Sequence, residues 1–165
     1  MSKSTGRPGG SAKSAKHKVA LVEDKPDEYV LSEQIGHLLR RAYQRHTSIF
    51  QVAIPDEKLT SVQFAVLTTV RDNPNSPLVH IGRLTAIDHA TLRDIVSRLK
   101  RRGLVTMKTG AEDKRQRIVS LTAEGEELVR DIIPEARNIT ELTLKNLDAC
   151  ERVAALAILK KLSQD

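Results

Sequence analysis

The sequence has no tryptophan, one cysteine and few aromatic residues, namely two tyrosines and two phenylalanines in 165 positions. A lone cysteine excludes a disulfide within the chain and a zinc site built from several cysteines. So few aromatics leave little with which to stack single-stranded bases. There is no apolar run of about 18 residues that would predict a membrane-spanning helix, and the charged N-terminus lacks the apolar core of a signal peptide. We therefore expect a cytoplasmic protein with no membrane partner.

Motifs for catalysis are also lacking. No HExxH pair, glycine-rich phosphate loop or GxSxG turn is present, and no histidine has a cysteine partner at the spacing of metal ligands. The sequence therefore predicts that the protein is not an enzyme and has no metal site and no cofactor. The chain has five histidines, none of them in such a motif: His17, His37, His46, His80 and His89.

What the chain does have is an excess of positive charge. It carries 27 Lys and Arg against 21 Asp and Glu, a formal net charge of +6. A basic balance favours a polyanionic partner, although membrane surfaces attract basic proteins too. Residues 1–20 contain basic but no acidic residues and many Ser and Gly. We expect residues 1–26 to form a disordered basic tail, either solvated or lying along DNA phosphates.

The next part of the chain has the pattern of amphipathic helices. From Tyr29 to Ala53 the apolar residues fall on one helical face. Thr60 precedes Gln63 by three residues, the spacing of a capping box that opens a second helix. Ser76 and Pro77 predict the start of a third helix, as cap and first-turn proline.

The segment from Ile81 to Thr122 is the most informative part of the sequence. A short helix leads through a turn into a second helix that Asp88 caps and Gly103 ends. Two β-type runs follow, Leu104–Thr109 and Arg117–Leu121, separated by a charged tip. This order predicts a mostly α fold with a small β-wing, a winged helix-turn-helix that places one helix in the major groove of double-stranded DNA.

The candidate DNA-binding residues lie on the outer face of that helix and on the wing. A charge run is usually a solvated face, and some winged helices bind proteins instead, but here the basic residues coincide with the motif. We expect base contacts near the start of the helix and phosphate contacts further along. The base-reading set is Ala90, Thr91, Arg93, Asp94 and Ser97, the phosphate set is Arg98 and Arg101, and the wing set is Asp113, Arg115 and Arg117.

The C-terminal region predicts two further helices, capped by Thr122 and by Asp148 with Glu151. The last helix and the Tyr29–Ala53 stripe offer more apolar surface than one thin lobe covers, which favours a homodimer. Cys150 lies near the start of the last helix without an adjacent basic residue. We therefore interpret it as a small hydrophobe buried at the dimer interface, and a redox sensor is the alternative.

These features resemble the MarR family of winged-helix transcription regulators over residues 29–163. The most specific match runs through Gly103–Val105, Asp113–Arg115 and Val119–Thr122, with Gly125 after it. It fits the family's GLV, DxR and vxLT wing signature. One departure is Ala86, where the family often has glycine in the turn. Alanine is tolerated there unless its φ is positive.

The resemblance implies a homodimer whose first and last two helices intertwine. It assigns 27–58 and 123–165 to a helical dimerisation layer and 59–122 to a DNA-binding lobe. A two-fold dimer implies a pseudo-palindromic operator with half-sites about 34 Å apart. The DxR match further implies that Arg115 enters the minor groove, held by Asp113.

The string Gly36–Ala42 is similar to regulators of aromatic-acid catabolism, including repressors of nicotinate degradation. This implies a repressor released by a small aromatic or pyridine carboxylate, bound between the two layers. The predicted ligand-binding set consists of aromatic and imidazole side chains for the ring and arginines for the carboxylate. For the histidine, a core position satisfied by a backbone carbonyl is the alternative. A protein-interaction or redox-sensing module without an effector is the alternative function. The predicted ligand-binding residues are Arg40, Arg41, Tyr43, His46, Phe50 and Phe64.

Overall fold

The computed structural model describes residues 29–54, 56, 59–111 and 113–164. The predicted basic tail, residues 1–26, lies outside the described residues. The fold is mostly α with one small sheet, as predicted. Its elements are η1 (Leu31–Glu33), α1 (Ile35–Ala53), α2 (Ser61–Asp72), β1 (Ser76–Pro77), α3 (Leu78–Thr85), α4 (His89–Arg101), β2 (Val105–Thr109), β3 (Arg117–Leu121), α5 (Ala123–Thr143) and α6 (Ala149–Leu162).

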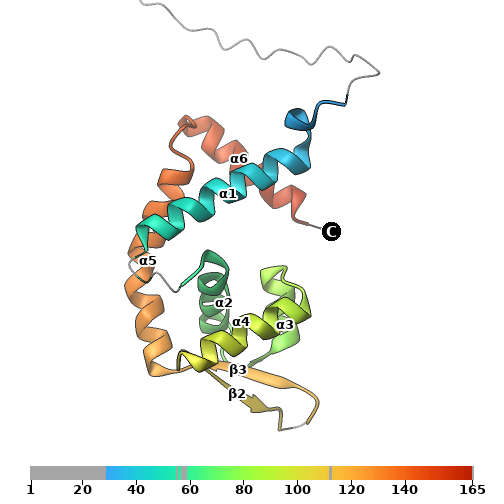
Figure 1. Ribbon diagram of the computed structural model, residues 1–165, viewed down its shortest axis with the longest axis vertical. Coiled ribbons are helices and arrows are strands. Elements are labelled where there is room, and N and C mark those ends of the chain that lie inside the picture. Colours follow the sequence, from blue (N-terminus) through green and yellow to red (C-terminus); the bar gives the residue numbers. More distant parts are fainter. Residues whose placement is uncertain (1–28, 55, 57–58, 112, 165) are drawn as a thin grey trace, which may run out of the picture.

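The elements form two layers (Figure 1). Helices α1 and α6 lie at one end of the molecule, α2 to α4 and the sheet lie at the other, and α5 runs from the sheet to the α1–α6 end. The hydrophobic core is concentrated in the sheet-bearing layer, where Leu67, Ile81, Leu92 and Leu99 are fully buried. Of the helices in the described residues, none has the length and apolar character needed to cross a membrane.

Both predicted capping boxes are confirmed. The N–H of Gln63 donates to Thr60 Oγ1 at 3.2 Å, and Gln63 Oε1 accepts from the N–H of Thr60 at 3.0 Å. Asp148 and Glu151 make the same reciprocal pair at the start of α6, at 2.9 Å each way. Each box satisfies two backbone donors that the first turn of a helix leaves unpaired.

Two helix starts differ from the sequence prediction. The first helix begins at Ile35 rather than Tyr29, because Gln34 is extended (φ −75°, ψ 132°) and separates it from η1. Ser76 and Pro77 do not open α3. They form β1, which pairs antiparallel with β3 opposite Val119 and Ile118. Proline suits this strand because β1 is at the edge of the β1–β3–β2 sheet, where a missing N–H is tolerated.

Helix α6 leaves its apolar side chains largely uncovered within the single chain. None of its described residues is buried, and Val153, Ile158 and Leu162 are more than half exposed. Cys150, at its second position, is exposed too. The expectation that this cysteine is buried at the dimer interface concerns a surface that the single chain leaves open, and it stays a prediction.

The turn between α3 and α4 is strained at one residue. Ala86 has φ 52° and ψ 33°, the left-handed region that glycine enters without penalty. The condition under which alanine would be tolerated there, a negative φ, is not met. A Cβ in this region costs about 1–2 kcal/mol.

Replacing Ala86 with glycine should therefore raise the free energy of unfolding. Relief of about 1–2 kcal/mol of strain outweighs the 0.4–1 kcal/mol or so by which glycine favours the unfolded chain. We expect a net gain of about 0.5 kcal/mol, measured by urea unfolding at fixed protein concentration. Ala90→Gly, in the first turn of α4, is the control and should lose stability, because a helical alanine has no strain to relieve. A lower stability of Ala86→Gly than of the parent would contradict the strain.

Candidate DNA interface and effector pocket

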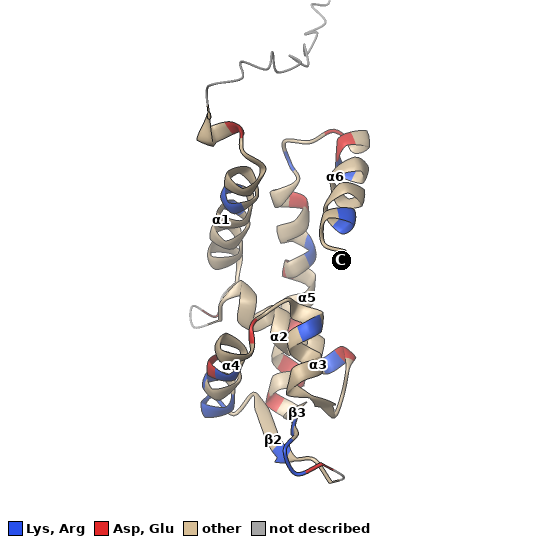
Figure 2. Cartoon of the chain, turned by 90° about the vertical axis from the view of Figure 1, so that its right-hand side faces the viewer, with Lys and Arg blue, Asp and Glu red and all other residues tan. Residues whose placement is uncertain are grey.

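Helix α4 is amphipathic, and its outer face carries the predicted DNA-binding residues. Leu92, Ile95, Val96 and Leu99 are buried on the inner face. Figure 2 shows basic residues gathered on α4 and along the wing. All the predicted α4 positions are exposed, namely Ala90, Thr91, Arg93, Asp94, Ser97, Arg98 and Arg101. Arg102, by contrast, is turned inward and pairs with Asp56.

Two of these side chains pair with each other. Arg98 Nη2 lies 2.7 Å from Asp94 Oδ2, one helical turn apart and with both side chains exposed. An exposed pair of this kind contributes at most about 1 kcal/mol. Arg98 can therefore exchange this partner for a DNA phosphate at little cost.

The start of α4 is fixed by Asp88. Its Oδ1 accepts a hydrogen bond from the backbone N–H of Thr91 at 3.0 Å. Hydrogen bonds from the side chain and the backbone N–H of Thr91 hold the pKa of the Asp88 carboxyl below its ordinary value. The carboxylate is thus charged at neutral pH and anchors the end of the helix that the helix-turn-helix motif inserts into the groove.

The wing tip is shaped by Asp113. Its Oδ1 accepts the backbone N–H of Arg115 at 2.9 Å, and its carbonyl accepts the N–H of Gln116 at 3.0 Å. Asp113 therefore orders the turn through the backbone N–H of Arg115 and leaves the Arg115 side chain exposed. At the base of the tip, Arg117 Nη1 donates to Thr109 Oγ1 at 2.7 Å across the strand pair.

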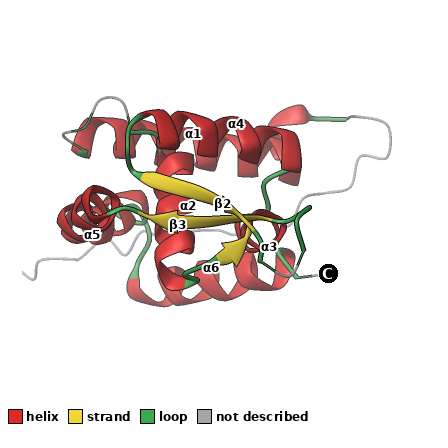
Figure 3. Cartoon of the chain, turned by 90° about the horizontal axis from the view of Figure 1, so that it is seen from below, coloured by secondary structure: helices red, strands yellow, loops and turns green. Residues whose placement is uncertain are grey.

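A groove of about 420 Å³ joins the helix and the wing. Three arginines meet there although they are up to 24 positions apart in sequence: Arg93 from α4, and Arg115 and Arg117 from the wing. His89, the first residue of α4, lies among them. Viewed from below, β2 lies beside α4, and β3 lies on the other side of β2 (Figure 3). Sequence reasoning missed the apolar wall of the groove, which is Pro77, Leu78 and Val79.

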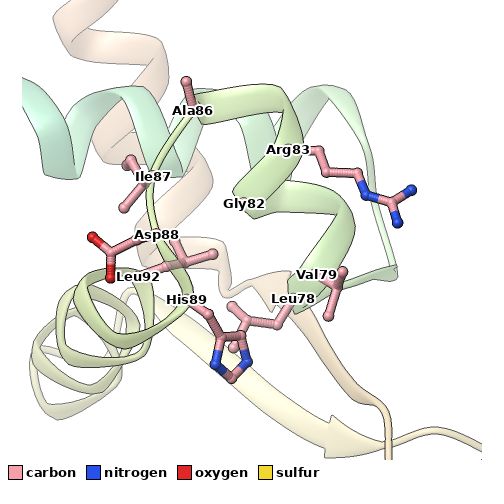
Figure 4. A pocket seen from close by; sticks show the side chains of 9 residues that line it. All are labelled: Leu78, Val79, Gly82, Arg83, Ala86, Ile87, Asp88, His89 and Leu92. Atoms are coloured by element: carbon pink, nitrogen blue, oxygen red, sulfur yellow. The ribbon is translucent and has the colours of Figure 1, made fainter.

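A second groove, of about 360 Å³, lies between α3 and the start of α4. Its floor is apolar, with Leu78, Ile87 and Leu92 (Figure 4). The charged ends of Arg83 and Asp88 point away from it (Figure 4). We therefore assign this groove to the packing of the helix-turn-helix rather than to a polar ligand.

The third site lies between the two layers. A cavity of about 290 Å³ opens between α1, α2 and α5, close to the lower end of the range of about 300–1,000 Å³ for small-molecule sites. Three of the six predicted ligand residues line it, one imidazole and two phenyl rings. The full lining is His46, Phe50, Ser61, Phe64, Ala65, Thr68, Ala136, Ile139 and Thr140.

The aromatic side chains of this pocket contact one another and the neighbouring helix α5. The rings of Phe50 and Phe64 are 5.8 Å apart between centroids, tilted by 41°. His46 Nδ1 lies 3.1 Å from the hydroxyl of Thr143 on α5. The partner of the imidazole is thus a threonine hydroxyl rather than the backbone carbonyl considered from the sequence.

The other three predicted ligand residues lie elsewhere. Arg40, Arg41 and Tyr43 are exposed on earlier turns of α1 and do not line the pocket of the single chain. Arg40 Nη2 is 3.3 Å from the ring of His37. The predicted contact of Arg40 and Arg41 with a ligand carboxylate stays a prediction. Sequence reasoning also missed Ser61, Thr68 and Thr140, because no pattern of neighbouring residues indicates that they line the pocket.

Comparison with known proteins identifies the family. Residues 59–125 match the model of a winged helix DNA-binding domain. The chain is 48% identical over 134 residues to the HTH-type transcriptional repressor NicR of Pseudomonas putida, covering 81% of this chain and 85% of that protein. The chain belongs to the MarR family of winged helix-turn-helix transcriptional regulators. The predicted wing, residues 103–125, lies within the part of the chain that matches the winged helix model.

Solved MarR-family structures share the fold over nearly the whole described chain. One is BpsR of Bordetella bronchiseptica, described with the regulation of its DNA binding by 6-hydroxynicotinic acid. It is 47% identical, with a TM-score of 0.78, covering 84% of this chain and 99% of that one. Another is PcaV of Streptomyces coelicolor in complex with its natural ligand. It is 27% identical, with a TM-score of 0.76, covering 82% and 96%.

Proposed function

We propose that this protein is a homodimeric repressor that binds a pseudo-palindromic DNA operator and is released by a small aromatic or pyridine carboxylate. The observation that carries the proposal is the pocket at the junction of the two layers, lined by α1 and α5 on one side and α2 on the other. Support comes from NicR, named a repressor, and from BpsR, whose DNA binding 6-hydroxynicotinic acid regulates. Its target being DNA, we place the protein in the cytoplasm, without a catalytic role.

The dimer follows from apolar surface that one chain leaves open. Leu31, Ile35 and Leu38 near the start of α1, with Val153 and Leu156 of α6, are between 47% and 71% exposed. Water contact with so many large apolar side chains is unfavourable, at about 25 cal/mol per Å². A second copy covers them, so residues 27–58 and 123–165 serve as the dimerisation layer.

DNA contact follows from the groove between α4 and the wing. Helix α4 enters the major groove with the base-reading set, and Arg98 and Arg101 contact phosphates. Arg115 reaches from the wing tip into the minor groove. Two such lobes, related by the two-fold axis, read half-sites about 34 Å apart.

Effector and DNA are coupled because the pocket spans both layers. A ligand that binds better to a dimer whose α4 helices are badly spaced for consecutive major grooves shifts the population toward that state. By linkage, operator DNA weakens the ligand by the same factor as the ligand weakens DNA.

The ligand prediction is tested by calorimetry of the DNA-free dimer against benzoate, nicotinate and their hydroxylated derivatives. At least one acid should bind, and His46→Ala should weaken it about tenfold, the value of roughly one hydrogen bond. His80→Ala, an exposed histidine outside the pocket, is the control and should bind as the parent does. Absence of binding by every acid would refute the effector. Equal affinity of His46→Ala and the parent would show that the acid binds outside this pocket.

A further inference from the structure

A short chain of hydrogen bonds decides which nitrogen of His46 carries the hydrogen. The Thr143 hydroxyl donates to the carbonyl of Ile139 at 2.7 Å. A carbonyl oxygen cannot donate, so the single hydroxyl proton lies in this shorter contact, and the Thr143 oxygen accepts at its second contact, from His46 Nδ1 at 3.1 Å. The hydrogen of the neutral imidazole is therefore on Nδ1, and the free nitrogen, Nε2, is an acceptor.

Two threonine hydroxyls that line the pocket also have their proton taken up by backbone carbonyls. The single hydroxyl proton of Thr68 is shared between the carbonyls of Phe64 and Ala65, each 3.0 Å from Oγ1. The hydroxyl of Thr140 donates to the carbonyl of Ala136 at 3.3 Å. Both oxygens keep lone pairs for a ligand but no proton. Three helices thus offer the pocket hydrogen-bond acceptors, and Ser61 adds a hydroxyl that can donate or accept. Among the described lining residues there is no lysine, arginine, aspartate or glutamate.

We propose that Thr143 is a positioning residue that holds His46 in the Nδ1–H form, so that the pocket accepts a hydrogen bond from its ligand. The ligand class this selects is an aromatic or pyridine ring bearing an O–H or N–H donor, such as a hydroxylated acid. A ring without a donor leaves Nε2 and the threonine oxygens unpaired, which costs affinity. The ligand part of this inference rests on the proposed effector function; the state of the imidazole does not.

The first test reads the imidazole directly. Nitrogen-15 NMR of the full-length dimer at about pH 8.5, where imidazole rings are neutral, distinguishes the two forms, and His46→Gln assigns the signal. The parent and Thr143→Ser should show the hydrogen on Nδ1. Thr143→Val, of the same size without the hydroxyl, should shift it toward Nε2. A parent ring with its hydrogen on Nε2, or a Thr143→Val ring unchanged, overturns the role of Thr143.

The second test compares acids that differ only by a ring hydroxyl: benzoate with 4-hydroxybenzoate, and nicotinate with 6-hydroxynicotinate. By calorimetry the hydroxylated member of at least one pair should bind about tenfold more tightly to the parent and to Thr143→Ser. In Thr143→Val the preference should shrink to within about threefold. Equal affinity within both pairs overturns the donor requirement. If none of the four acids binds, the proposed effector function fails, while the NMR result still decides what Thr143 does to His46.

Discussion

Replacing Gly125 with alanine should lower the free energy of unfolding by about 3 kcal/mol. The first turn of α5 lies directly on the backbone at the base of the wing: the N–H of Thr122 donates to the carbonyl of Leu104 at 3.1 Å. A Cβ on Gly125 would lie 2.1 Å from that same oxygen. Alanine gains about 1 kcal/mol of helix propensity over glycine, but a backbone atom cannot rotate away, so the overlap outweighs the gain.

The Gly125 prediction is measured by urea unfolding at fixed dimer concentration, because association contributes to stability. Glu126→Ala, at the next and exposed position of α5, should change the value by no more than about 0.5 kcal/mol. If Gly125→Ala matched this control, the close approach of α5 to Leu104 would be wrong. A partly folded variant would still report the effect through a lower midpoint.

Replacing Arg115 with alanine should weaken operator binding by about 1–3 kcal/mol, roughly ten- to a hundredfold in the dissociation constant. The wing turn carries this guanidinium at its tip, because Asp113 binds the backbone N–H of Arg115 and so orders the turn without using the arginine side chain. Removing the side chain leaves that turn intact, so the loss reports DNA contact rather than folding.

The Arg115 measurement is fluorescence anisotropy at constant salt, with a duplex selected from a random library by the parent protein. Lys114→Ala is the matched control, since it removes a neighbouring exposed charge from the same tip. It should cost only the general electrostatic contribution of one cation. Equal losses from the two variants would mean that the wing attracts DNA by charge alone and that Arg115 has no specific site.

The DNA-binding lobe was predictable because its signals are local. Gly103 ends α4 with φ 74°, a conformation that its lack of a Cβ permits. Asp88 caps α4 through the N–H of Thr91, three residues on. Such contacts span two to four positions and therefore leave a pattern that can be read without tertiary structure.

The parts that sequence reasoning missed depend on distant partners. Ser76 and Pro77 form a strand only because residues 118 and 119 lie beside them. His46 meets Thr143, 97 positions later, so its helical periodicity gave no sign of the hydroxyl that orients it. The periodicity did place His46 and Phe50 on one face, and that face lines the pocket. What it missed was the contribution of α5.

The central claim is that one dimer binds operator DNA and a small aromatic acid in opposition. The most direct measurement is a titration of the selected duplex with the full-length protein at rising concentrations of the acid that calorimetry identifies, with the acid's affinity for the DNA-bound dimer measured in parallel. We predict that the operator dissociation constant rises with the acid, and that DNA weakens the acid by the same factor. An operator affinity unchanged by saturating acid would contradict the account.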